Sequence, residues 1–370
     1  MTRLLFLATE DWFVASHFLP LIRRAEAEGY DVAVAARMSG ALAGKTGARL
    51  IDLAVDRRSL GLSQLLRERA HVAAALSDFK PDIVHAIALR PVLLALMTPS
   101  AGARRVFAVT GRGTLAVRRT PAARIILGAL ARAIRAAVNR GDALLVENEA
   151  DRAWVARGVS LPAARVAQMP GAGVDTDVFA SSPEPGAPVV VGLVARLVRS
   201  KGIDLAVEAV ARLRREGLAI ELRIAGDVDA ENPEHVPAAE IEQWRATPGV
   251  SLLGRIDDVA GFWAGAHIAC LPSRGGEGLP RVLLEAAACG RPIITTDVPG
   301  CRDFVLAEET GLVAPAGDVD ALAASLRRLA LDRDLRTRLG AAGRARVVEA
   351  YSERHAADVA ARLWRRVLER

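Results

Sequence analysis

Short runs of apolar, strand-like residues alternate with helical patterns along almost the whole chain of 370 residues. Such alternation is typical of parallel α/β units, in which each helix connects two neighbouring strands. The expected strands form two series, at residues 4–8, 31–35, 49–54, 83–88, 105–109, 143–147 and 165–169, and then at 189–195, 220–225, 250–253, 268–272, 292–296 and 312–314. The sequence therefore predicts an α/β protein with two doubly wound domains, which bind ligands at the carboxyl ends of their strands.

The segment FASSPEPGAPV, residues 179–189, separates the two series. It holds three prolines and several small residues, so it is predicted to be the linker between the domains. The expected domains are residues 1–180 and 187–351. Helical patterns close the chain, and the last of them, residues 352–370, is expected to pack back on the first domain.

Three further features limit the class of protein. No run approaches about 18 uncharged apolar residues, so no segment is expected to span a bilayer. Met1 leads directly into a strand-like run, and no signal peptide is expected. The three cysteines show no metal-binding spacing, so we expect reduced, buried thiols.

Positive charge is concentrated in the first half of the chain. The net charge is +6, yet residues 83–141 contain no acid. Ten arginines lie in that interval: Arg90, Arg104, Arg105, Arg112, Arg118, Arg119, Arg124, Arg132, Arg135 and Arg140. This asymmetry indicates an anionic partner for the first domain.

A carboxylate, Glu285, stands in a segment that is otherwise apolar on every helical face, residues 282–288. A helix that is apolar all round is buried. An unpaired carboxylate there would cost several kcal/mol, so it needs hydroxyl or amide donors. The vicinal hydroxyls of a ribose would supply two. The alternative that stays open is an ion pair with a structural arginine.

A second carboxylate, Glu277, precedes this helix in the glycine-flanked loop GGEGLP. Pro280 suits the first helical turn, where a missing N–H does no harm. The amides near Gly278 and Leu279 would then point out of the helix start, toward phosphate or sugar oxygens. The alternative is a solvated loop charge.

Two cations occupy the loop that follows the predicted strand 189–195. Arg196 and Lys201 stand five residues apart, before a helical pattern. They can straddle a diphosphate, the arginine by forked hydrogen bonds and the lysine as a point charge. Combined with carboxylates for hydroxyl groups in a neighbouring unit, they indicate a nucleotide-sugar site.

The chain resembles the retaining glycosyltransferases of family 4, which have the two-domain GT-B fold. The resemblance rests on ARLVRSKG, which follows the pattern G-R-L-x-x-x-K-G with alanine in place of the first glycine, and on the E-x7-E spacing of Glu277 and Glu285. It is nearest to transferases that build bacterial glycans on undecaprenyl diphosphate, such as the N-acetylgalactosaminyltransferase type. The implied architecture is two Rossmann-like domains that face a central cleft.

The resemblance implies a donor-binding role for nine residues. Arg196 and Lys201 would hold the diphosphate and offset charge on the leaving group. Glu285 would bind the ribose. Glu277 would hold the transferred sugar. The remaining five would be the backbone at Gly278, Leu279 and Pro280, which would hold the sugar together with Glu277, and Arg255 and Ile256, which would lie against the base. No metal or other cofactor is expected.

The acceptor side departs from the family pattern. In TEDWFVASH, Trp12 and Phe13 stand where many members have two glycines, whereas His17 fits the usual histidine. Where many members have a further histidine, this chain reads VTGRGT, with Gly111 and Arg112. The bulkier loop is expected to alter how the acceptor or the diphosphate is approached.

The basic segment 118–141 is predicted to be an amphipathic helix. Ile125 and Ile126 would share its apolar stripe with Leu130, Ile134 and Val138. Arg118, Arg119 and Arg124 could meet an anionic leaflet. The alternative is a surface helix whose apolar side packs on the core.

The expected partners are a nucleotide-sugar donor, a lipid-linked glycan acceptor and the anionic inner-membrane surface, on the cytoplasmic side. Nucleic acid is not expected, because the chain is only 4% aromatic and shows no binding motif. No complete Gly-x-Gly-x-x-Gly follows the first strand, which excludes a nicotinamide-dependent dehydrogenase. A nucleotide-sugar epimerase on the same fold and a non-catalytic sugar-nucleotide-binding protein remain alternatives.

Overall fold

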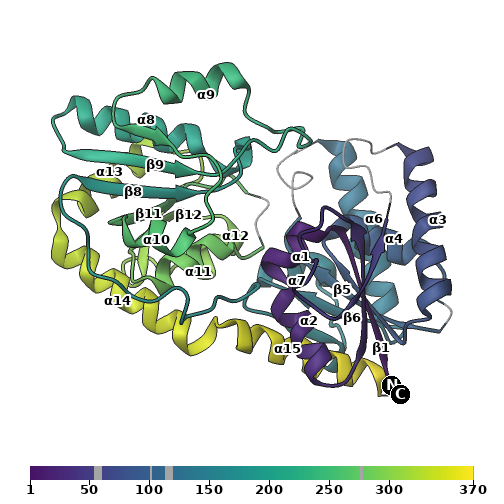
Figure 1. The fold of residues 1–370 in the computed structure, drawn as a ribbon. Helices are drawn as coiled ribbons and strands as arrows, with labels where there is room; N and C mark the ends of the chain where they lie inside the picture. Colours follow the sequence, from purple (N-terminus) through teal and green to yellow (C-terminus); the bar gives the residue numbers. More distant parts are fainter. Residues whose placement is uncertain (54–60, 101, 113–119, 276–277, 370) are drawn as a thin grey trace. The chain divides into compact units, whose positions relative to one another are not determined.

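The computed structural model describes residues 1–53, 61–100, 102–112, 120–275 and 278–369. The chain forms two compact units (Figure 1). The first unit comprises Met1–Gly173 and Glu353–Arg370, and the second comprises Val174–Ser352. Glu277, Arg118 and Arg119 lie outside the described residues.

The first unit is built on a seven-stranded sheet with the order β3-β2-β1-β4-β5-β6-β7. All its pairings are parallel. The strands are β1 (Arg3–Glu10), β2 (Asp31–Arg37), β3 (Arg49–Asp52), β4 (Ile83–Ile87), β5 (Arg104–Val109), β6 (Ala143–Val146) and β7 (Val166–Gln168). Most central strands are buried along their length, as apolar runs in parallel sheets predict.

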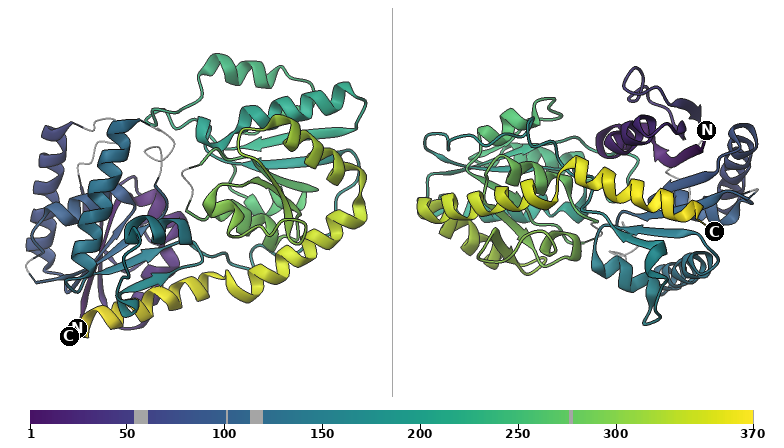
Figure 2. Two further views of the ribbon diagram at one scale, coloured as in Figure 1. Left: turned by 180° about the vertical axis from the view of Figure 1, so that it is seen from behind. Right: turned by 90° about the horizontal axis from the view of Figure 1, so that it is seen from below.

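Helices cover both faces of this sheet (Figures 1 and 2). One hydrophobic cluster joins the sheet to α1 (Asp11–His17), α2 (Leu19–Ala27) and the C-terminal α15 (Glu353–Leu368). The other joins it to α3 (Leu62–Phe79), α4 (Leu89–Met97), α6 (Pro121–Val138) and α7 (Glu149–Ala156). The C-terminal helix is therefore part of the first unit's core.

The second unit has a six-stranded parallel sheet with the order β10-β9-β8-β11-β12-β13. Its strands are β8 (Val189–Val194), β9 (Ile220–Ala225), β10 (Val250–Leu252), β11 (Ile268–Leu271), β12 (Ile293–Thr296) and β13 (Gly311–Ala314). The helical segments are η2 (Arg199–Lys201), α8 (Ile203–Arg215), α9 (Ala238–Arg245), α10 (Val259–Ala264), α11 (Arg281–Ala288), α12 (Pro299–Arg302), α13 (Val319–Leu331) and α14 (Arg333–Ala350). The cores on the two faces are centred on α8 with α13 and on α11.

The predicted linker is not a free connection. The units divide between Gly173 and Val174, ahead of residues 179–189. That segment lies along the second unit, where Arg291 donates to the carbonyl oxygen of Ser182 (2.9 Å). Glu184 also pairs with the largely buried Arg336 (2.8 Å). Its prolines and small residues therefore mark a strap on the second unit, and the linker prediction is wrong.

Two further features follow directly from side-chain character. The three cysteines are buried and unbridged. Burial raises the pKa of the Cys270 thiol to about 12, so it stays protonated at neutral pH. None of the helices in the described part of the chain is both long and apolar enough to cross a membrane.

Candidate functional site

The strand order of the second unit fixes where a ligand can bind. Strands β8 and β11 are neighbours, yet the chain runs outward from β8 through β9 and β10 before it returns to β11. Loops from two such strands diverge to opposite faces and leave a crevice at their carboxyl ends. The loop after β8 carries Arg196 and Lys201, and the loop after β11 leads to α11 and Glu285. The sheet thus brings the two predicted cations, Arg196 and Lys201, and the predicted carboxylate Glu285 to one crevice.

The two loops are in direct contact. Gly202 has φ of +67°, and a Cβ atom there would lie 2.0 Å from the carbonyl oxygen of Pro272. The Ser273 hydroxyl and the Arg274 amide both donate to the carbonyl oxygen of Ser200, at 3.1 and 2.7 Å. Only glycine allows this approach. The contact fixes the backbone on both sides of Lys201.

Arg196 forms an ion pair with a carboxylate of the second unit. Its guanidinium is about half exposed and pairs with Asp229 (2.6 Å), whose carboxylate is only 11% exposed. The backbone beneath it is close-packed, because a Cβ atom on Gly226 would lie 1.9 Å from the carbonyl oxygen of Ala195. A diphosphate would have to compete with Asp229 for this cation.

Helix α11 is less uniformly buried than the sequence suggested. Its buried face is Leu283, Leu284, Ala286, Ala287 and Ala288. Arg281, Val282 and Glu285 are half-buried. The Glu285 side chain is 13% exposed, and Arg281, one turn earlier, donates to it from Nε (2.9 Å). The arginine partner that the sequence left open is therefore present, and the prediction of a helix buried on every side is wrong.

The start of α11 is also shifted. Pro280 is the N-cap residue rather than part of the first turn, and the helix begins at Arg281. Gly278 and Leu279 are buried just ahead of it. The N-terminal end of a helix favours anionic or oxygen-rich ligands, because its amides and its dipole both point outward.

The predicted base-binding residues occur further along the same sheet edge. Arg255 is exposed and Ile256 is half-buried, both in the loop after β10. The Gly226 amide donates to the carbonyl oxygen of Gly254 (2.7 Å), which ties this loop to the one after β9. The ends of three strands, β8, β10 and β11, thus carry predicted donor-binding residues, and β9, which lies between β10 and β8, carries none.

The acceptor-side residues of the first unit are spread over separate elements. His17 ends α1, where its ring lies 4.6 Å from that of Phe13. Gly111 follows β5 with φ of +100°. Arg112 pairs with the buried Asp151 (2.9 Å), so a carboxylate of the fold already compensates its charge. Arg124 is exposed on α6.

Comparisons with known proteins decide the family. The family described as "Glycosyl transferase 4-like" matches residues 3–148, and "Glycosyl transferases group 1" matches residues 188–332. A GDP-mannose-dependent α-(1-6)-phosphatidylinositol monomannoside mannosyltransferase of Mycolicibacterium smegmatis is 31% identical over 274 residues, which is 68% of each chain. The chain belongs to the group 1, family 4-like glycosyltransferases.

Other matches to this glycosyltransferase are partial in length or distant in sequence. The capsular polysaccharide glycosyltransferase CapM of Staphylococcus aureus is 31% identical over 163 residues, 44% of this chain and 42% of CapM. The chain spans less than half the length of the first curated relatives that it matches. Anabaena HepE, solved in complex with UDP-glucose, superposes with a TM-score of 0.77 at 17% identity over 99% of this chain and all of HepE. These structures establish the GT-B fold.

Residues that the sequence did not single out also shape the glycosyltransferase's crevice. Asp229 and Arg274 lie in loops at the strand ends, and Asp204 lies in the first turn of α8. No short motif marks them, since each acts through a partner that is distant in the chain. Within the described ranges, no group of three or more His, Cys, Asp or Glu side chains is arranged to hold a metal ion.

Proposed function

We propose that this glycosyltransferase moves a sugar, an N-acetylhexosamine or a hexose, from a UDP-sugar to a lipid-diphosphate-linked glycan, with retention at the anomeric carbon. The assembly of bacterial surface polysaccharide or glycoprotein glycan is the proposed setting, as the printed names of CapM and related proteins suggest. The carrying observation is that Arg196, Lys201 and the Glu285 helix meet at one switch point.

The proposed roles follow from charge and position. Lys201 and Arg196 would neutralise the diphosphate as the bond from the sugar C1 to the phosphate oxygen breaks. Glu285 would accept hydrogen bonds from the ribose hydroxyls. Glu277 and the helix start at Gly278, Leu279 and Pro280 would hold the sugar.

The chemistry balances without a redox partner. The acceptor hydroxyl oxygen bonds to C1 on the face that the phosphate leaves. Its proton passes to the departing phosphate oxygen, and UDP is released. Because two cations and a helix start would offset the developing charge, we propose that no metal is required. EDTA should then leave the rate of transfer unchanged.

The acceptor explains why the first unit is basic. A lipid-diphosphate carrier places the reaction at the cytoplasmic face of the inner membrane. We propose that the arginines at and before α6, Arg118, Arg119 and Arg124, hold the enzyme at that anionic surface.

A donor panel tests the proposal. Purified protein is incubated with UDP- and GDP-sugars, with and without a detergent-solubilised lipid-diphosphate acceptor. UDP release that depends on acceptor supports the proposal. Turnover with GDP-mannose alone would assign the nucleotide of the mycobacterial relative instead. Isomerised donor would indicate an epimerase, and binding without turnover a non-catalytic protein.

Two substitutions test the residue roles. Glu277→Gln should keep the fold and abolish most transfer, because sugar contacts strengthen in the transition state. Near-normal kcat would refute that role. Lys201→Ala should weaken donor binding and slow transfer together, whereas Lys45→Ala, an exposed lysine of the first unit, should change neither.

A further inference from the structure

One face of α6 is not used by the core. The buried residues of the helix include Leu127, Leu130 and Ile134. Ile125 and Ile126 are 72% and 50% exposed. The sequence prediction that both isoleucines lie on one apolar stripe with Leu130, Ile134 and Val138 is therefore wrong, because those three are buried. Two adjacent exposed isoleucines on a helix rich in arginine are typical of a surface that meets lipid.

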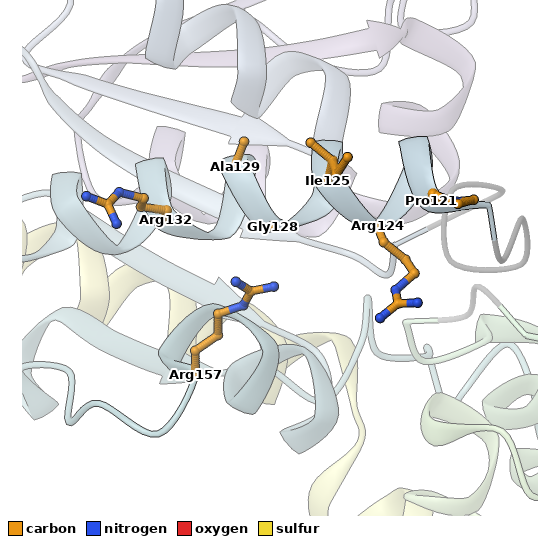
Figure 3. Close-up of a pocket in the computed structure, with 7 residues that line it drawn as sticks. All are labelled: Pro121, Arg124, Ile125, Gly128, Ala129, Arg132 and Arg157. Atoms are coloured by element: carbon orange, nitrogen blue, oxygen red, sulfur yellow. The ribbon is translucent and has the colours of Figure 1, made fainter.

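A shallow pocket of about 610 Å³ lies on this face (Figure 3). Its lining is apolar or cationic: Pro121, Arg124, Ile125, Gly128, Ala129, Arg132 and Arg157. Figure 3 shows the Arg157 side chain rising from the end of α7 toward Gly128, with Arg124 reaching down on the same side of α6. Among the described residues, no carboxylate pairs with Arg124, Arg132 or Arg157. The pocket therefore carries three uncompensated positive charges.

Two locally unfavourable residues build the pocket. Glycine inside a helix costs about 1 kcal/mol relative to alanine. A Cβ atom on Gly128, however, would lie 3.1 Å from Nη2 of Arg157. Arg157 itself caps α7 in the left-handed conformation (φ 48°, ψ 46°), which asparagine or glycine adopts more readily. Gly128 and the left-handed backbone of Arg157 together position the Arg157 guanidinium against the backbone of α6. Strained backbone conformations occur more often at functional sites.

We propose that this pocket binds the phosphate of an anionic phospholipid headgroup, with Ile125 at its rim entering the interface. The inference rests on the proposed function and deepens it, because it names the residues that touch the leaflet. Forked guanidinium groups suit phosphate oxygens. Exposed isoleucine on the same face favours lipid over single-stranded nucleic acid, whose binding sites offer aromatic side chains for base stacking.

Two substitutions remove the pocket without a cost in folding. Arg157→Asn deletes one charge at a backbone conformation that asparagine tolerates. Gly128→Ala pushes the guanidinium tip away by a few tenths of an ångström and improves helix propensity. The matched control is Arg140→Asn, which removes an equal charge from an exposed residue beyond the C-terminal end of α6. The full chain is sedimented with phosphatidylcholine vesicles, with and without equimolar phosphatidylglycerol and free of acceptor.

The wild type should bind only the anionic vesicles. Arg157→Asn should weaken that binding about fivefold, Gly128→Ala should weaken it by a smaller factor because it removes no charge, and the control should weaken it less than about twofold. Equal effects of Arg157→Asn and Arg140→Asn, or none, would overturn the pocket. Two other results would also overturn the proposal. If the pocket variants bind vesicles normally but have a raised KM for detergent-solubilised acceptor, the pocket belongs to the acceptor diphosphate. If the wild type loses vesicle binding in millimolar inorganic phosphate, the pocket binds free phosphate. Transfer in detergent is measured separately, so its absence would refute the proposed function and leave the vesicle result standing.

Discussion

Arg274 and Asp204 form a bidentate ion pair that joins the loop after β11 to the first turn of α8. The guanidinium donates to Oδ1 and Oδ2 of Asp204 at 2.7 and 2.6 Å. It also donates to the carbonyl oxygen of Arg199 (3.0 Å). Burial would raise the pKa of Asp204, but the hydrogen bonds from Arg274 hold that pKa below its ordinary value. The segment that carries Lys201 is thus held from both sides.

Asp204→Asn should loosen that segment. Both side chains are about one-third exposed, so solvent screening limits the loss in free energy of unfolding to about 1 kcal/mol. Donor affinity should fall several-fold as Lys201 loses its fixed position. Urea unfolding and titration with UDP-sugar measure the two effects. As the control, Asp320→Asn breaks the exposed pair with Arg212 and should change neither quantity. Unchanged donor affinity in Asp204→Asn would show that the Arg274–Asp204 pair contributes only to the stability of the fold.

Gly202→Ala should be more harmful than left-handed backbone strain alone predicts. A left-handed alanine costs roughly 1–2 kcal/mol. Gly217→Ala, at φ of +91° with open space around it, should cost only that amount. At Gly202 the new Cβ atom would also meet the carbonyl oxygen of Pro272, and backbone cannot move as a side chain can. We expect a larger loss in urea unfolding, together with weaker donor binding. Equal losses at the two positions would show that the loops separate freely.

The strands could be predicted from the sequence because their cause is local. Buried parallel strands are continuous apolar runs, and all thirteen expected runs lie on strands of the two sheets. The strap at residues 179–189 was mistaken for a linker because composition does not show what a segment packs against. The Arg281–Glu285 pair stands at the helical spacing of four, so the sequence can indicate which arginine is the partner of Glu285.

Long-range partners could not be predicted. The segment TEDWFVASH has no glycine turn and forms α1 instead of a loop. The first residue of α1, Asp11, is fully buried and accepts hydrogen bonds from the amides of Ser39, Gly40 and Ala41. Such a clamp between distant residues leaves no periodic trace in the sequence. The pairing of Arg196 with Asp229 escapes prediction for the same reason.

Asp229→Asn should raise donor affinity. The wild-type carboxylate neutralises Arg196 and would repel an incoming diphosphate, so its removal should tighten binding several-fold at low ionic strength. Asp227→Asn, an exposed aspartate two residues earlier, is the control. Calorimetric titration with UDP measures the change. Weaker binding in Asp229→Asn would instead assign Asp229 the task of orienting the guanidinium.

His85 should make the first unit sensitive to acid. Trp364 of α15 donates to its Nδ1 (2.9 Å), and complete burial lowers the pKa of His85 from 6.5 to about 3. The folded state therefore excludes a proton that the unfolded chain binds. This stability is fully present above the unfolded pKa and is lost as pH falls toward the folded one, by at most about 1.4 kcal/mol per pH unit. His85→Gln keeps an acceptor for Trp364 but cannot titrate. Its free energy of unfolding, measured with urea, should therefore fall less between neutral pH and about pH 5 than that of the wild type. The control is His71→Gln at an exposed histidine, whose free energy of unfolding should fall with pH as in the wild type. If the free energy falls equally with pH in all three proteins, the acid-sensitive group lies elsewhere.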